Sequence, residues 1–198
     1  HCYPCRHGKY NLCEELKVMG FQTTGTASEF FAVDASKVTP IPAEMSFEEG
    51  AMIEPLAVAV HGVKQMGDVA GMNITVIGAG PIGNLVAQTA KGMGAAKVMI
   101  TDVSTLRLEK AKECGVDVCV NTKDVDFGEA MLDAFGPDKA DVIYDCAGNN
   151  VTMGQAIKHA RKGSVIVLVA VFAGMAEVDL AVANDHELDI KSTMMYRH

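Results

Sequence analysis

The sequence lacks an excess of positive charge. It carries 17 lysine and arginine residues against 25 aspartate and glutamate residues, a formal net charge of −8. Nucleic acids and anionic membranes are bound by basic surfaces, so this balance argues against both kinds of partner. For the same reason a nucleic-acid-binding zinc finger is a poor interpretation of the cysteines near the N-terminus.

Long hydrophobic runs are also absent. The longest, Val165 to Ala176, is too short to span a bilayer and contains a glycine. No charged-then-apolar leader opens the chain, so no export signal is expected. The chain shows neither repeats at solenoid periods nor low-complexity tracts. Six cysteines, three of them clustered, favour metal binding in a reducing compartment over disulfides, and we therefore expect a cytoplasmic protein.

What is present is a large apolar content, 49% of 198 residues, enough for one full domain and part of a second. The chain starts without Met, in the middle of a cysteine motif. We therefore expect a fragment of a longer protein, truncated at both ends. The expected division is a remnant domain over residues 1–45 and a nucleotide-binding domain over residues 46–198.

The central stretch is residues 74–102. A β-branched run from Ile74 to Ile77 predicts a buried strand, which leads into Gly-x-Gly-x-x-Gly and an apolar helix from Asn84 to Met93. A second strand then runs from Lys97 to Thr101 and ends at Asp102. This is the complete context of a dinucleotide-binding fingerprint, whereas the glycines alone could form a tight turn that binds nothing.

Each residue of this fingerprint has a physical task. Gly78 allows a sharp turn, Gly80 lets the backbone approach a diphosphate, and Gly83 lets the helix lie close to the sheet. The free N–H groups and the positive dipole end of the following helix face the phosphates, and Pro81 is counted among the cofactor-binding residues. Asp102, nineteen residues past Gly83, is expected at the adenosine ribose, where a carboxylate accepts hydroxyl protons and repels a 2′-phosphate. The sequence therefore predicts NAD rather than NADP.

Three cysteines near the N-terminus form a candidate metal site. Cys2 and Cys5 have Cys-x-x-Cys spacing, and Cys13 follows after seven residues, an arrangement in which thiolates gather around Zn²⁺. A fourth ligand could be an upstream cysteine, His1 or His7. The alternative is a set of unrelated free thiols.

A helix is predicted to start at Phe47, after the capping box from Ser46 to Glu49, and to be buried because it is apolar nearly all round. Glu54 lies inside it, and Pro55 predicts a helix break there. A buried acid at such a break is either a metal or catalytic site, or a carboxylate satisfied by an arginine or backbone amides. His61 is interpreted as a hydrogen-bonded core residue.

The remaining chain alternates helices and strands, which predicts a parallel sheet covered on both faces, an α/β Rossmann fold. The predicted helices span Thr105 to Cys114, Phe127 to Phe135 and Val151 to Arg161. The predicted strands are Glu29 to Val33, Val116 to Val120, Asp141 to Asp145, Ser164 to Val171 and Leu188 to Thr193.

The strand ends are where such sheets bind ligands. Small residues there, Ala147, Gly148 and Ala170, leave room for a cofactor, or could serve packing alone. Arg107 lies in a helix first turn, where a cation is disfavoured, so it is expected to cover adenine or ribose. The alternative is a solvated arginine paired with Glu109 or Glu113.

Four features are considered together here: the cysteine spacing, the segment from Glu49 to Leu56, the fingerprint with Asp102 and Arg107, and Asp189-Ile190-Lys191. Together they resemble the zinc-dependent medium-chain dehydrogenases. Within them the sequence is most similar to the sorbitol (L-iditol) dehydrogenase branch. The resemblance implies a GroES-like catalytic-domain remnant with a structural-zinc lobe, a second catalytic zinc, and a homodimer or homotetramer. It assigns Cys2, Cys5 and Cys13 to structural zinc and Glu54 to the catalytic zinc. NAD-contacting positions by resemblance are Ile82, Asp102, Arg107, Val169, Ala170, Val171 and Met194.

The resemblance implies NAD- and zinc-dependent oxidation of a small polyol or secondary alcohol to a ketone. Met195 departs from it, because sorbitol enzymes usually carry an arginine there. Alternatives within the family are threonine, 2,3-butanediol or sugar-phosphate dehydrogenases. An alternative of another class is an NAD-binding domain without catalysis, because most catalytic zinc ligands are missing from the chain.

Overall fold

The computed structural model describes residues 2–197. It contains two compact units that divide between Ile53 and Glu54. The larger unit, Glu54–Tyr196, carries the sheet and all the candidate cofactor residues. The predicted boundary between residues 45 and 46 stays a prediction.

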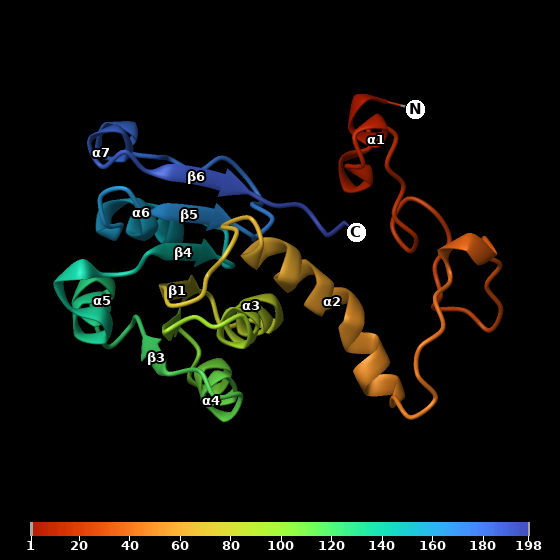
Figure 1. Cartoon of the computed structure of the whole chain (residues 1–198), viewed down its shortest axis with the longest axis horizontal. Helices are drawn as coiled ribbons and strands as arrows, with labels where there is room; N and C mark the ends of the chain where they lie inside the picture. Colours follow the sequence, from red (N-terminus) through yellow and green to blue (C-terminus); the bar gives the residue numbers. More distant parts are fainter. Residues whose placement is uncertain (1, 198) are drawn as a thin grey trace. The chain divides into compact units, whose positions relative to one another are not determined.

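Six parallel strands form one sheet in the order β3-β2-β1-β4-β5-β6 (Figure 1). The strands are β1 (Asn73–Ile77), β2 (Lys97–Asp102), β3 (Val118–Asn121), β4 (Val142–Asp145), β5 (Val165–Leu168) and β6 (Asp189–Ser192). The chain runs outward from β1 to β3, then returns to place β4 on the other side of β1. This confirms the predicted doubly wound Rossmann fold, in which ligands bind at the carboxyl ends of the strands where the order reverses.

Helices cover both faces of this sheet (Figure 1). They are α2 (Phe47–Val63), α3 (Pro81–Gly92), α4 (Thr105–Glu113), α5 (Phe127–Phe135), α6 (Asn150–His159) and α7 (Leu180–Asp185), and the N-terminal unit adds α1 (Tyr3–Arg6). Short 3₁₀ turns are η1 (Tyr10–Leu12), η2 (Ala35–Lys37) and η3 (Gly136–Asp138). The end of α2 packs with α3 and α4 on one face, and α5, α6 and α7 pack on the other.

The strands are apolar on both sides because both faces are covered. Val76 and Tyr144 pack toward the α3 face, whereas Ile143 and Ile166 pack toward the α5 face, and all four are fully buried. The Tyr144 hydroxyl donates a hydrogen bond to the Val63 carbonyl at 3.1 Å, which joins β4 to the end of α2. Burial of each large side chain stabilises the fold by about 2 kcal/mol.

The helix α2 starts as predicted but then differs from its prediction in two ways. The capping box is confirmed, since Ser46 N–H donates to Glu49 at 2.8 Å and Glu49 N–H to Ser46 Oγ at 3.1 Å. The predicted break at Pro55 is wrong, because the helix continues through it. Ala51, whose carbonyl would have accepted the missing Pro55 N–H, is exposed, so water can satisfy it. The prediction of a buried helix holds only for its last two turns, since Phe47 to Leu56 is largely exposed.

The N-terminal unit has no hydrophobic core within its described residues. From residue 2 to residue 53 the one buried residue is Asn11. The predicted strand from Glu29 to Val33 is wrong, since that segment has no regular structure. Within residues 2–197 no strand pairs with this segment, and propensity alone does not sustain one.

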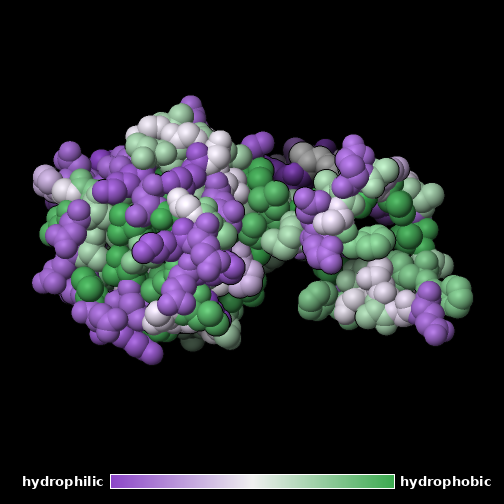
Figure 2. Space-filling model, turned by 90° about the horizontal axis from the view of Figure 1, so that it is seen from below, coloured by the Kyte–Doolittle hydropathy of each residue, from purple (hydrophilic) through white to green (hydrophobic). Residues whose placement is uncertain are grey.

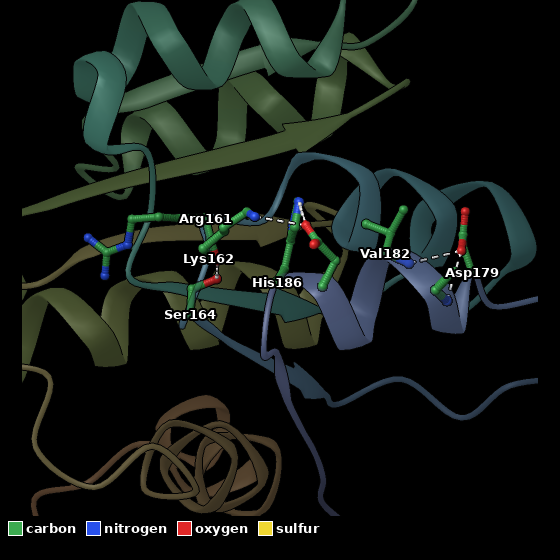
Figure 3. Close-up of polar contacts among 8 residues, drawn as sticks. Arg161, Lys162, Ser164, Asp179, Val182 and His186 are labelled. Carbon is green, nitrogen blue, oxygen red and sulfur yellow. Dashed lines mark hydrogen bonds and ion pairs between the residues drawn. The ribbon is translucent and has the colours of Figure 1, made fainter.

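The C-terminal part of the sheet shows smaller departures. The strand predicted over Ser164 to Val171 ends at Leu168, and α7 was not predicted. Figure 3 shows the local bonds: the Ser164 hydroxyl donates to the Arg161 carbonyl at 2.7 Å, and Asp179 accepts the Val182 N–H at 3.0 Å as the cap of α7. A capping aspartate before a short apolar run was the available sequence signal.

Polar side chains are spread over the larger unit, with apolar patches between them (Figure 2). Among residues 2–197 no helix combines the length and the apolar character needed to cross a bilayer.

Candidate functional site

The glycine loop between β1 and α3 has the geometry that its sequence predicts. Gly78 has a φ of +96°, so it makes the turn in a conformation that other residues rarely adopt. A Cβ on Gly83 would lie 1.8 Å from the Gly78 carbonyl oxygen, so Gly83 is required by the close approach of helix and strand. Gly80 is different: its φ of −66° suits any residue, and its Cβ would meet no atom within 4 Å. The protein itself does not need a glycine at position 80, whereas a ligand lying against this backbone would.

The N-terminus of α3 opens beside Gly80. Pro81 is the first helical residue and has no N–H, and the first N–H with a partner inside the helix is that of Asn84, bonded to the Gly80 carbonyl at 2.9 Å. No side chain caps this end. The N–H groups of Ile82 and Gly83 and the positive end of the helix dipole are therefore available to an anion.

Asp102 lies at the end of β2, directly across from the glycine loop. Its Oδ2 accepts the Ala79 N–H at 2.7 Å, and its Oδ1 accepts the N–H groups of Val103 and Ser104 at 2.7 and 2.9 Å. Ser104, the residue before α4 (Thr105–Glu113), makes no side-chain capping bond. A carboxylate offers about four acceptor positions, so about one remains, on Oδ2, for a ribose hydroxyl.

Arg107 is placed by α4 next to this carboxylate. Its Nη1 lies 3.6 Å from Asp102 Oδ2, and its side chain is more than half exposed. Of the alternative partners, Glu113 pairs with Lys110, and within the described residues Arg107 forms its ion pair with Asp102 and none with Glu109. Arg107 is thus available to lie over a group that binds beside Asp102.

A second buried carboxylate organises the loop after β4. Asp145 is fully buried, and its Oδ1 accepts the N–H groups of Ala147 and Gly148 at 2.9 and 3.0 Å. Its main-chain carbonyl accepts the N–H groups of Val169 and Ala170 at 2.9 and 3.0 Å, where the chain leaves β5. One residue therefore fixes both strand ends beside the glycine loop.

These elements enclose two clefts that share Cys146 and Ala147. The first, about 350 Å³, contains the predicted residues Gly78, Gly80, Asp102, Arg107 and Ala147. The second, about 370 Å³, contains the predicted residues Ile82, Ala147, Val169, Ala170, Val171 and Met194. The predicted residues Pro81, Gly83 and Gly148 line neither cleft and instead shape the turns around them.

Several lining residues were missed by sequence reasoning. They are Thr122, Asn149, Thr152 and Gln155 in the first cleft and Val58 in the second. Thr152 and Gln155 are three residues apart on a helix that follows a strand end, a spacing that places them on one face. That spacing was the one available signal.

Glu54 does not occupy the buried position predicted for it. Its side chain is exposed and lines neither cleft, because the first half of α2 lies at the surface. Within residues 2–197 it belongs to no group of metal ligands. It does act on Tyr196, whose pKa is raised by partial burial and by the nearby Glu54 carboxylate. His61 hydrogen-bonds Gln65 at 3.3 Å, in line with the structural interpretation.

The three N-terminal cysteines are brought together. Cys2 Sγ lies 3.4 Å from Cys5 Sγ and 3.9 Å from Cys13 Sγ, and all three sulfurs lie within 4.8 Å of one another. Tetrahedral Zn–S bonds place two sulfurs about 3.8 Å apart, so this cluster fits zinc. A hydrogen bond from the backbone of Glu14 lowers the pKa of Cys2 to about 7, which favours the thiolate that zinc needs.

Of the other proposed ligands, His7 is not part of this cluster within the described residues. His7 stacks on Tyr3, and its Nδ1 bonds the Tyr3 carbonyl at 2.8 Å. His1 lies outside the described residues.

The larger unit is a dinucleotide-binding domain of the Rossmann class. Its defining features are the doubly wound sheet, the glycine loop open to an anion, and the carboxylate of Asp102 at the end of the next strand. Residues 81–198 match the family described as zinc-binding dehydrogenase. The chain belongs to that family.

The chain is similar to several named dehydrogenases. It is 34% identical over 202 residues to L-idonate 5-dehydrogenase of Vitis vinifera, covering all of this chain and 55% of the relative. It is 35% identical over 195 residues to human sorbitol dehydrogenase, covering 97% of this chain and 55% of the relative. A structure from Escherichia coli described as a short-chain alcohol dehydrogenase with NADH superimposes with a TM-score of 0.91 at 32% identity, covering all of this chain and 58% of that one. The chain thus spans about half the length of the curated relatives it matches.

Proposed function

We propose that this chain is the cofactor-binding part of an NAD- and zinc-dependent dehydrogenase that oxidises a polyol or secondary alcohol to a ketone. The observation that supports this most is Gly80, a glycine that neither backbone conformation nor packing requires, at an uncapped helix N-terminus between two clefts. The identity to sorbitol and L-idonate dehydrogenases supports the substrate class.

Different residues bind different parts of the dinucleotide. The N–H groups of Ile82 and Gly83 hold the diphosphate, and Asp102 accepts one ribose hydroxyl on Oδ2. A 2′-phosphate at that place would meet the Asp102 carboxylate, which favours NAD over NADP. Arg107 covers the adenosine half from the solvent side.

The second cleft holds the nicotinamide half. Its lining is mostly apolar, with Val169, Ile82 and Met194 among its residues. Such a wall excludes water from the ring and fixes its orientation, and orientation is the main contribution a protein makes to cofactor chemistry. When bound, NAD⁺ supplies the hydride acceptor, and zinc supplies a Lewis acid that lowers the pKa of the alcohol. Glu54 is proposed as an acidic residue at that zinc, bound directly or through water.

A second candidate is a domain that binds NAD without catalysis. It is favoured by the exposed position of Glu54 and by the single metal-ligand cluster found in residues 2–197, which is the cysteine cluster.

The proposed dehydrogenase is expected to form a homodimer or a homotetramer. Light scattering measures this oligomeric state.

The test is a titration of the 198-residue chain with NADH, followed by fluorescence, and then an assay with NAD⁺, zinc and a panel of sorbitol, L-iditol, L-idonate, 2,3-butanediol and threonine. The proposal expects NADH binding and, among active substrates, preference for a polyol. Absence of NADH binding would contradict both candidates. NADH binding with no turnover of any alcohol favours the non-catalytic candidate, and zinc-dependent turnover excludes it.

A further inference from the structure

The first cleft has a polar wall formed by α6 and by the segment after β3. Most hydrogen-bonding groups on this wall are already used. Asn149 Oδ1 accepts two N–H groups of the first turn of α6, at 3.0 and 3.1 Å. The Thr152 hydroxyl donates to Asp145 Oδ2 at 3.2 Å. The side chain of Gln155, half-buried in the same cleft, makes no hydrogen bond within the described chain.

The position of Gln155 in the cleft follows from its neighbours. Gly78 and Gly80 mark the diphosphate end, and Asp102 marks the ribose. The base of a dinucleotide lies beyond its ribose, and the cleft lining outside the glycine loop and Asp102 includes Arg107 and Gln155. Gln155 is thus a polar side chain on the wall of the cleft in which we place the purine.

We propose that Gln155 reads the base of the cofactor: its side-chain carbonyl accepts a hydrogen bond from the 6-amino group of adenine, and its amide N–H donates to N7. This assignment rests on the NAD-binding function proposed above. A carboxamide combines one donor and one acceptor in a plane, which is the complement of the N6/N7 edge of adenine.

The alternative bases fail at this edge for a physical reason. Hypoxanthine and guanine carry an oxygen at position 6, so both of their edge atoms accept and neither donates. The Gln155 carbonyl would then face another acceptor in a half-buried cleft and lose its partner. Sites that hydrogen-bond a ligand group reject the analogue that lacks the group far better than apolar pockets reject a change of size.

The test compares NADH with deamino-NADH, in which hypoxanthine replaces adenine and the rest of the molecule is unchanged. The 198-residue chain is titrated with each by fluorescence. The wild-type chain is expected to bind NADH about tenfold more tightly than deamino-NADH. In Gln155→Met, which keeps the side-chain length and removes the amide, NADH binding weakens about tenfold and the two dinucleotides bind within about twofold of each other.

The matched control is Gln88→Met. Gln88 lies on α3, donates to Asn84 Oδ1 at 2.9 Å and lines neither cleft, so this variant should keep the wild-type base preference. Equal wild-type affinity for the two dinucleotides, or a preference that survives in Gln155→Met, overturns the assignment and leaves the NAD-binding proposal intact. Wild-type chain that binds neither dinucleotide overturns both.

Discussion

The Asp102 carboxylate accepts the Ala79 N–H at 2.7 Å, across the gap between the end of β2 and the glycine loop. The residue expected to bind the ribose therefore also fixes the loop that binds the diphosphate. A change at this residue acts on stability and on cofactor choice together, and the two effects have to be measured separately.

Asp102→Ala is predicted to lower the free energy of unfolding by about 2–3 kcal/mol, since three backbone N–H groups lose a charged acceptor. It should also weaken NADH binding and reduce the preference for NADH over NADPH. Urea unfolding measures the first effect and paired titrations the second. Asp102→Asn keeps an acceptor for two of the N–H groups and should be the milder variant. An unchanged preference for NADH over NADPH would show that Asp102 does not contact the ribose.

Gly80 and Gly83 are predicted to respond oppositely to alanine. Gly80→Ala should change the free energy of unfolding by less than about 1 kcal/mol, because its methyl group enters open space. NADH affinity should nevertheless fall at least about tenfold, because the methyl group occupies the diphosphate position. Gly83→Ala should destabilise the fold by about 3 kcal/mol, because its Cβ collides with the Gly78 carbonyl. Full NADH binding by Gly80→Ala would remove the main support for the proposed function.

The buried Asp145 offers a test of the loop after β4. Asp145→Ala removes the acceptor of two backbone N–H groups and of the Thr152 hydroxyl. It should therefore lower the free energy of unfolding by about 3 kcal/mol. Asp145→Asn is the matched variant, since its carbonyl can serve the two N–H groups while its amide donates to the Thr152 oxygen; we expect a loss of about 1 kcal/mol. Equal losses in the two variants would mean that charge, not hydrogen-bond geometry, holds this loop.

The cysteine cluster is predicted to bind zinc. Elemental mass spectrometry of the purified chain should find about one zinc per chain. Cys13→Ser should lower that content, whereas Cys114→Ser, at an exposed cysteine that ends α4, should not. The same low zinc content in wild type and Cys13→Ser would contradict a metal site at this cluster.

A pH effect is predicted at the cap of α5. Hydrogen bonds from the N–H groups of Glu129 and Gly128 lower the pKa of Asp126. Its folded pKa therefore lies below the unfolded value of about 3.9, so its stabilisation is complete above that value and is lost as the pH falls through the folded pKa. Urea unfolding between about pH 5 and about pH 3 should show a smaller loss of stability for Asp126→Asn, an uncharged cap, than for wild type.

The local elements of the larger unit were readable from the sequence because local rules decide them. The helix from Phe127 to Phe135 and the strand from Lys97 to Asp102 have the predicted bounds, since apolar periodicity and flanking glycines fix them. The distinct tasks of Gly78 and Gly83 followed from the motif alone and are confirmed by the backbone geometry. The family also followed, because cysteine spacing and the Glu49 to Leu56 segment are themselves sequence features.

Other features depend on what a residue meets in space, and here sequence reasoning failed. Pro55 does not break α2, and Glu54 is exposed, because the surroundings of that helix are not encoded in its own pattern. The placement of Gln155 in the same cleft as Asp102 depends on how α6 packs against the sheet.

The amino-acid sequence by itself determined the class of fold, the glycine loop and the six sheet strands in chain order, since their patterns can be seen in neighbours a few residues apart. Only the tertiary structure decided which donors and acceptors remain unused around the cofactor cleft. The reason is that hydrogen bonds such as those of Asp102 and Asp145 join segments whose separation is set by the packing of the whole sheet.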